Sequence, residues 1–155
     1  MKIFFKKGMT IVEILITLAI FVILLSIVLP QFSKIRENQV LKSTVSDIMS
    51  NLNKAQSQTL ASVDSSSYGV HFQSDKVIIF KGIVFSASDS NNNTTDIVAP
   101  ALISNVTLGG VSGNSGDVYF DRLSGSPNIA GTVTLSTTNY SKIITISVTG
   151  MASIN

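Results

Sequence analysis

The stretch Lys6–Pro30, KKGMTIVEILITLAIFVILLSIVLP, decides the organisation of the chain. Its residues Ile11–Leu29, 19 in number, are almost all apolar. In a helix that rises about 1.5 Å per residue, this length matches the roughly 30 Å hydrocarbon core of a bilayer. No cleavage pattern of small residues follows in LPQFSKIREN, as it would after a secretory signal peptide. We therefore expect a membrane anchor and not a removable signal peptide.

The positive charge of the chain is concentrated before this anchor. The sequence pI is about 9.0, and three of the 11 Lys and Arg residues, Lys2, Lys6 and Lys7, precede the apolar run. The rest of the chain has 8 basic and 9 acidic residues. Such a local charge is typical of the cytoplasmic flank of a membrane helix, not of a nucleic-acid-binding surface. Cysteine is absent, which excludes disulfides and thiolate metal sites.

Glu13 lies one helical turn inside the apolar run. A charged side chain at the centre of a membrane helix costs about 2.5–3.5 kcal/mol, and less near the interface, so it usually faces a partner. Lys7 is the nearest cation in the sequence. A cut between Gly8 and Met9 would create a closer one, an α-amino group four residues before Glu13. In a bundle of parallel copies, that amine could meet Glu13 of a neighbour, so assembly would satisfy the charge.

In these residues the chain resembles the type IV pilin and pseudopilin superfamily. KKG, MTIVE and ILITLAIFVILLSIVLPQF follow its order of basic leader, glycine, glutamate at the fifth mature position and proline at the twenty-second. Met9 stands where phenylalanine is commonest in the family. The resemblance implies a leader at residues 1–8, which a prepilin peptidase removes after Gly8 before it methylates the amine of Met9. It also implies that Glu13 guides docking onto other pilin or pseudopilin subunits in the inner membrane.

The helix is expected to have two parts that meet at Pro30. Residues 9–30 form a transmembrane and filament-core helix. Proline lacks an N–H, so the carbonyl of Ser26 loses its partner, and we expect a helix break at Pro30; the resemblance implies unwinding there in a filament, and a simple kink at the membrane exit stays open. Residues 31–61 form an amphipathic helix, whose stripe is Ile35, Leu41, Val45, Ile48, Leu52, Ala55 and Thr59.

Residues 62–155 are expected to form an antiparallel β-sheet domain. YGVHF alternates in polarity and predicts a half-buried strand, and Ser74-Asp75 suits a hairpin turn before the next one. Polar residues 86–100 predict an exposed loop. The expected strands are 67–73, 76–87, Leu102–Leu108, Asp117–Arg122, Thr132–Thr137 and Lys142–Thr149. The fold class is therefore α+β and pilin-like: a long N-terminal helix, half membrane and half amphipathic, packed on a C-terminal antiparallel sheet domain.

A second resemblance concerns the sheet domain. VYFDRLSGSP and KIITISVTGMASIN are similar to segments of H-type minor pseudopilins and fimbrial T-type minor pilins. This resemblance implies a structural subunit of a type II secretion pseudopilus or a type IV pilus, with the domain in the periplasm or otherwise outside the cytoplasm. DNA-binding members carry arginines in the final hairpin, whereas this region offers only Arg122 and Lys142 for phosphates.

Other chemistries find less support in the sequence. The one histidine, His71, lies in a strand without a G-x-S-x-G elbow, so no enzyme, catalytic residue or cofactor is predicted. Asp89, Asp96, Asp117 and Asp121 do not form a calcium-loop motif, and no metal site is predicted. Two alternatives to the structural subunit remain: a DNA- or surface-binding minor pilin of a competence or adhesion pilus, and a plain membrane-anchored domain unrelated to filaments.

Overall fold

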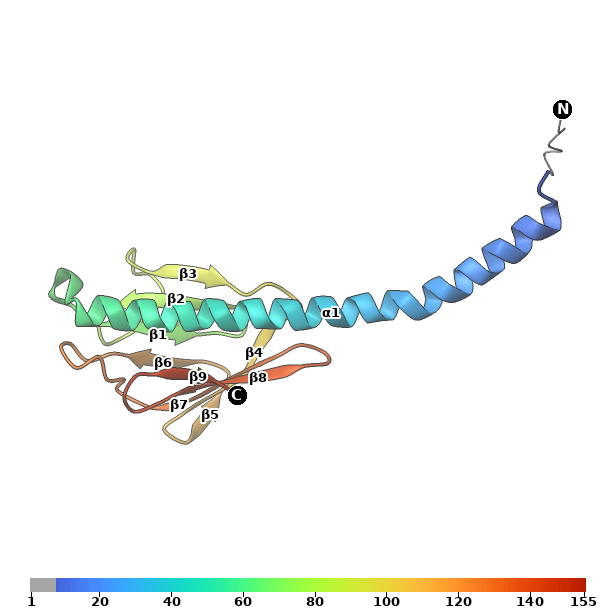
Figure 1. The fold of residues 1–155 in the computed structure, drawn as a ribbon. Helices are drawn as coiled ribbons and strands as arrows, with labels where there is room; N and C mark the ends of the chain where they lie inside the picture. Colours follow the sequence, from blue (N-terminus) through green and yellow to red (C-terminus); the bar gives the residue numbers. More distant parts are fainter. Residues whose placement is uncertain (1–7) are drawn as a thin grey trace, which may run out of the picture. The chain divides into compact units, whose positions relative to one another are not determined.

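The computed structural model describes residues 8–155, so most of the leader expected at residues 1–8 lies outside the described residues. Helix α1 (Ile11–Leu60) comes first and is followed by a single 3-10 turn, η1 (Val63–Ser65), and by strands only (Figure 1). The strands are β1 (Tyr68–Phe72), β2 (Lys76–Lys81), β3 (Asn93–Asp96), β4 (Leu102–Leu108), β5 (Val111–Gly113), β6 (Gly116–Tyr119), β7 (Gly131–Ser136), β8 (Ser141–Ile146) and β9 (Ala152–Ile154). All of their pairings are antiparallel, which confirms the expected α+β class.

The chain divides into two compact units, Met1–Arg36 and Glu37–Asn155. In the described part of the first unit, residues 8–36, every residue is exposed. Helix α1 runs through Pro30 without interruption. The helix is therefore not interrupted at Pro30 in this single chain, although the missing N–H of the proline removes one hydrogen bond from this turn. Unwinding of this segment in a filament stays a prediction.

In the second unit, residues 37–60 of α1 pack one face onto the sheets. The buried positions follow helical spacing and are Leu41, Thr44, Val45, Ile48, Leu52, Ala55 and Thr59. This confirms the expected stripe except at Ile35, which is 62% exposed and belongs to the first unit. The helix ends at Leu60, one residue before the expected end, and Ser62 has a left-handed backbone with φ of 49° that no helix continues.

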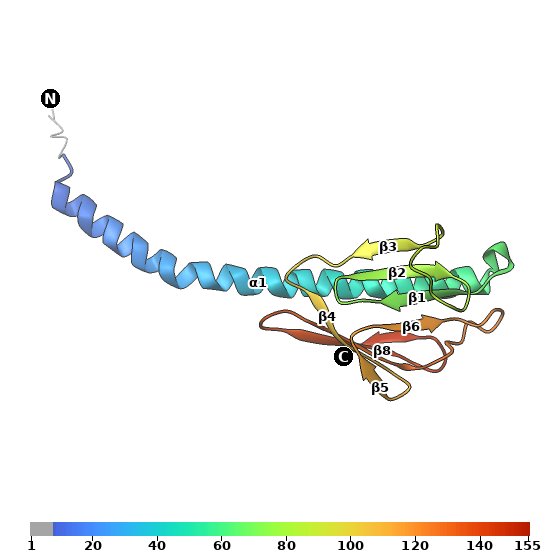
Figure 2. The ribbon, with the colours of Figure 1, turned by 180° about the vertical axis from the view of Figure 1, so that it is seen from behind.

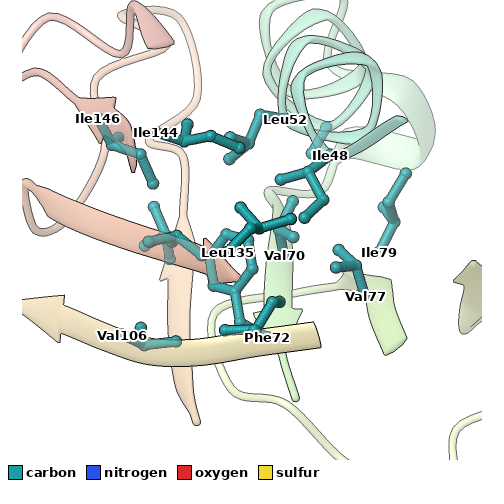
Figure 3. Close-up of a cluster of buried hydrophobic side chains, with 14 of the residues drawn as sticks. Ile48, Leu52, Val70, Phe72, Val77, Ile79, Val106, Leu135, Ile144 and Ile146 are labelled. Atoms are coloured by element: carbon teal, nitrogen blue, oxygen red, sulfur yellow. The ribbon is translucent and has the colours of Figure 1, made fainter. Parts of the chain in front are cut away.

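Two sheets complete the second unit. The first has the order β3-β2-β1-β6 and the second the order β5-β4-β7-β8-β9. Their inner faces and α1 enclose a single cluster of apolar side chains, in which Ile48 and Leu52 of the helix meet Val70, Phe72, Leu135 and Ile144 of the strands (Figure 3). Fully burying such a side chain contributes about 1.5–3 kcal/mol, so this cluster holds the helix on the sheets.

The strand predictions differ from the structure in informative ways. Strand β1 is buried on both faces, and not half-buried as its alternation suggested. The ring of Phe80 lies across Gly69, where a Cβ would come within 2.4 Å of it, and the ring of Phe85 stacks on His71. The rings of Phe80 and Phe85 therefore cover Gly69 and His71 on the outer face of β1.

Other boundaries also shift. Strand β2 ends at Lys81, because Gly82 turns the chain with φ of 106°. The segment 86–100, expected to be a loop throughout, contains β3, which pairs with β2. Strands β5 and β9, which were not expected, each pair three residues at the edge of the second sheet. Strand β4 has the bounds that were predicted, and β6, β7 and β8 begin one residue early.

Candidate functional site

The amino-terminal end of α1 brings the candidate processing and assembly residues together. Gly8, Met9 and Thr10 precede the helix. A Cβ placed on Gly8 would find no atom within 4 Å, and Met9 is 68% exposed. The peptide bond between Gly8 and Met9 therefore lies outside the helix.

Glu13 has a local role that sequence reasoning did not foresee. The backbone N–H of Glu13 donates to Thr10 Oγ1 at 3.3 Å, and the N–H of Ile14 donates to the Thr10 carbonyl at 3.2 Å. Thr10 is thus the N-cap of α1, and Glu13 stands at the third helical position, as in the T-x-x-E capping pattern. The signal that could have revealed it is the spacing of TIVE itself.

This cap explains part of the position of Glu13 but not its charge. A carboxylate in the first helical turn gains about 0.3–1 kcal/mol from the helix dipole. It also lies near the end of the apolar run, where a charge costs less than the 2.5–3.5 kcal/mol at a bilayer centre. The dipole carries only a partial positive charge, and no ion pair within residues 8–155 involves Glu13. Residues 8–155 therefore supply no full counter-charge to Glu13.

The helix surface around Glu13 is suited to lipid or to other helices. Every large apolar side chain from Met9 to Ile35 is at least 39% exposed. Thr17 and Ser26 donate their hydroxyls to the carbonyls of Ile14 and Ile23, at 2.9 and 2.7 Å, so neither leaves a polar group unpaired in an apolar medium.

Exposed apolar surface this extensive marks a contact with protein or with a membrane. Within residues 8–155, α1 is the one helix long and apolar enough to cross a membrane. The structure is therefore compatible with a membrane anchor.

The remaining sequence candidates do not gather into one site. His71 pairs through Nδ1 with the carboxylate of Asp117, and its ring stacks on Phe85 at 3.8 Å between centroids. An Asp-His pair of this kind can activate a nucleophile that hydrogen-bonds to the free ring nitrogen. Within the described residues, however, Nε2 of His71 is buried and has no hydrogen-bond partner. A serine that it could activate is thus not in contact with it.

The aspartates and the basic residues are also dispersed. Asp89 accepts hydrogen bonds from the backbone and side chain of Asn91, which hold the pKa of Asp89 below its usual value. Residues 8–155 contain no group of three or more His, Cys, Asp or Glu side chains that could hold a metal ion. Arg122 donates from Nη1 to the Ser65 carbonyl at 2.7 Å, so this arginine already binds the domain itself.

Comparisons of the chain with protein-family models, with curated proteins and with solved structures found no match.

Proposed function

We propose that this chain is a minor pilin or H-type pseudopilin, a structural subunit of a type II secretion pseudopilus or a type IV pilus. A prepilin peptidase removes the leader after Gly8, Met9 becomes the methylated first residue, and Glu13 docks the helix against other pilin subunits. The subunit is held in the inner membrane by one span, with its amino end in the cytoplasm and its sheet domain on the other side.

The observation that carries this proposal is Glu13. It is the one charged residue of the sequence between Gly8 and Ser33, on a helix whose every described residue up to Arg36 is exposed. A helix of this kind supplies its own N-cap but not a cation. Cleavage after Gly8 creates an amine four residues before Glu13 in each chain. In a bundle of parallel helices, the amine of one chain meets Glu13 of its neighbour. A plain anchor, which is not cleaved, has no such amine.

Processing is the test that separates a pilin from a plain anchor. The full chain is co-expressed with an active prepilin peptidase and, separately, with an inactive one, and the extracted protein is analysed by intact mass and amino-terminal sequencing. We expect a chain that begins at Met9 and carries one added methyl group, with the active peptidase only. A chain that begins at Met1 in both cases would exclude the proposal.

The matched control is Gly8→Val. Because no atom lies within 4 Å of a Cβ at this position, the substitution leaves the described fold undisturbed. It places a branched side chain directly before the cut, where the family has glycine. Loss of processing in this variant, with normal membrane insertion, would show that the peptidase reads this position and that general proteolysis does not account for the shorter chain.

A further inference from the structure

A polar hollow opens in the second unit, between the last turns of α1 and strands β2 and β3. Its volume is about 280 Å³, and residues of α1, η1, β1, β2 and β3 line it. Strand β3 is the edge of its sheet and lies alongside the C-terminal half of α1 (Figure 2). The volume is close to the lower limit for ligand pockets, about 300 Å³.

Two lysines line the hollow, Lys81 with an ion pair and Lys54 without one among the described residues. Lys81 donates to Asp64 Oδ2 at 3.0 Å, and the Tyr68 hydroxyl donates to the same oxygen at 3.4 Å. The hydrogen bond to Asp64 raises the pKa of Lys81, and that to Lys81 lowers the pKa of Asp64. Lys54 has no ion pair within residues 8–155. The hollow therefore has a net positive charge, and both ammonium groups retain donors for a ligand.

Gln58, which lines the hollow, has an acceptor without a donor. Oε1 of Gln58 is buried and has no hydrogen-bond partner within the described residues. Leaving such an atom unpaired costs about 1–3 kcal/mol, so a ligand that donates to it would recover this cost. A bare inorganic anion could satisfy the lysines but offers no N–H to Gln58. The residues call for an anion with a donor beside it.

The turn that follows α1, beside the hollow, has a strained backbone. Ser62, Asp64 and Ser65 have left-handed backbones, with φ of 49°, 49° and 53°. Such conformations cost of order 1–3 kcal/mol each in residues other than glycine, and they are concentrated at ligand-binding and other functional sites. Of these three residues, Asp64 lines the hollow, and its carboxylate accepts hydrogen bonds from Lys81 and Tyr68 there.

We propose that the hollow binds the carboxyl end of an extended polypeptide. The terminal carboxylate lies between Lys54 and Lys81, and the last backbone N–H donates to Gln58 Oε1. The peptide reaches the hollow along β3, whose outer edge pairs with no other strand of residues 8–155. Asn93, the first residue of β3, lines the hollow, so a segment paired along this edge ends beside it.

This site is independent of the proposed assembly through Glu13 and Met9. All of its residues belong to the second unit, and its occupancy does not require processing or a filament. A negative result with either proposal leaves the other intact.

The test uses the full chain in detergent micelles and isothermal titration with acetyl-Ala-Ala-Ala, as the free acid and as the carboxamide. We expect the acid to bind with a Kd of about 1 mM or below. The carboxamide should bind at least about tenfold more weakly, because it cannot form charge-assisted bonds to the lysines. Equal binding of acid and amide, or a Kd of the acid well above about 10 mM, would overturn the proposal.

Two variants of the hollow, one control variant and one competing ligand sharpen the result. Lys54→Met should weaken binding of the acid about fivefold, whereas Lys42→Met, on the same helix and also exposed but outside the hollow, should leave it unchanged. Gln58→Met should reduce binding of the acid as well, since it removes the acceptor. Glucuronate carries a carboxylate beside a hydroxyl donor. If it binds more tightly than the peptide acid, the site is for sugar acids and the peptide assignment is wrong.

Discussion

At the scale of single residues, Glu13 combines a local and an intermolecular requirement. Its backbone is capped by Thr10, and its position in the first turn suits the helix dipole. A neutral residue at position 13 would keep the cap, because the cap bond comes from the backbone N–H. The carboxylate itself is needed only if something outside the helix carries the opposite charge. These two roles can be separated by mutation.

We predict that Glu13→Gln reduces incorporation into filaments by a large factor, while Thr10→Val does not. The first variant keeps the cap and removes the charge. The second removes the cap, at a cost of about 1 kcal/mol to the helix end, and keeps the charge. Both should insert into the membrane normally. The amount of subunit in sheared filaments, relative to that in membranes, measures the effect, and equal incorporation of wild type and Glu13→Gln would contradict the docking role.

Asp64 allows a pH test of a surface ion pair. Its bond to Lys81 lowers the pKa of Asp64 below the ordinary value of 3.8. A depressed carboxyl pKa contributes stability above the unfolded pKa, and this stability is lost as the pH falls through the folded pKa. Asn is the matched replacement, because it tolerates the left-handed backbone at position 64 as well as Asp does.

We therefore predict that Asp64→Asn lowers the denaturation midpoint slightly at pH 7, and that the difference from wild type disappears well below pH 3.8. Both proteins are unfolded by denaturant in detergent and followed by circular dichroism. High salt at pH 7 should shrink the difference too, since the pair is exposed to solvent. A difference that persists unchanged in acid would mean that the substitution acts through the backbone and not through the charge.

At the scale of elements, α1 changes character along its length. Its first part is apolar on all sides and entirely exposed, and its second part buries one stripe against the sheets. Apolar residues of the same helix are therefore exposed in the first unit and buried against the sheets in the second. Which apolar side chains stabilise the folded domain depends on whether a sheet covers them, and the sequence pattern alone places Ile35 in the same stripe as Ile48.

A pair of isoleucines tests this division. We predict that Ile48→Ala lowers the free energy of unfolding of the domain by about 2–5 kcal/mol, because Ile48 is 1% exposed and its removal leaves a cavity. Ile35→Ala is the control. Ile35 is 62% exposed in the first unit, so it should change the unfolding free energy by less than about 0.5 kcal/mol. Denaturant unfolding of the full chain in detergent measures both, and similar losses for the two variants would contradict the boundary at Arg36.

At the scale of the whole molecule, the sheet domain is incomplete without the helix. The inner faces of both sheets share their apolar cluster with five residues of α1: Leu41, Val45, Ile48, Leu52 and Ala55. Glu37 adds a polar tie, since its Oε2 accepts hydrogen bonds from the backbone and side chain of Asn139 in the turn between β7 and β8. A fragment cut after the helix would expose this cluster to water.

We predict that residues 37–155 are soluble and unfold cooperatively, and that residues 62–155 aggregate or lack fixed tertiary structure. The shorter fragment loses five buried apolar side chains, of which the four larger ones each contribute about 1.5–3 kcal/mol. Their combined contribution is comparable with the whole stability of a typical domain, about 5–15 kcal/mol. Gel filtration and near-ultraviolet circular dichroism distinguish the two fragments. A compact, cooperatively unfolding 62–155 would show that the sheets hold together without α1.

The sequence by itself determined the features that repeat or that break a pattern over a long stretch. The apolar run Ile11–Leu29, the single charge at Glu13 and the stripe from Leu41 to Thr59 all follow from spacing along one helix. Strand β4 and the hairpin of β1 and β2 were predictable for the same reason, because local alternation and turn residues define them. The pilin assignment and the roles of Gly8 and Met9 stay predictions.

Only the tertiary structure decided which surfaces are covered. β1 is buried on both faces because Phe80 and Phe85 fold back over it, and β3, β5 and β9 are strands because neighbouring strands offer them backbone partners. The hollow beside Gln58 joins residues from five elements. Long-range contacts of this kind depend on how distant segments meet, and the composition of a short segment does not encode them.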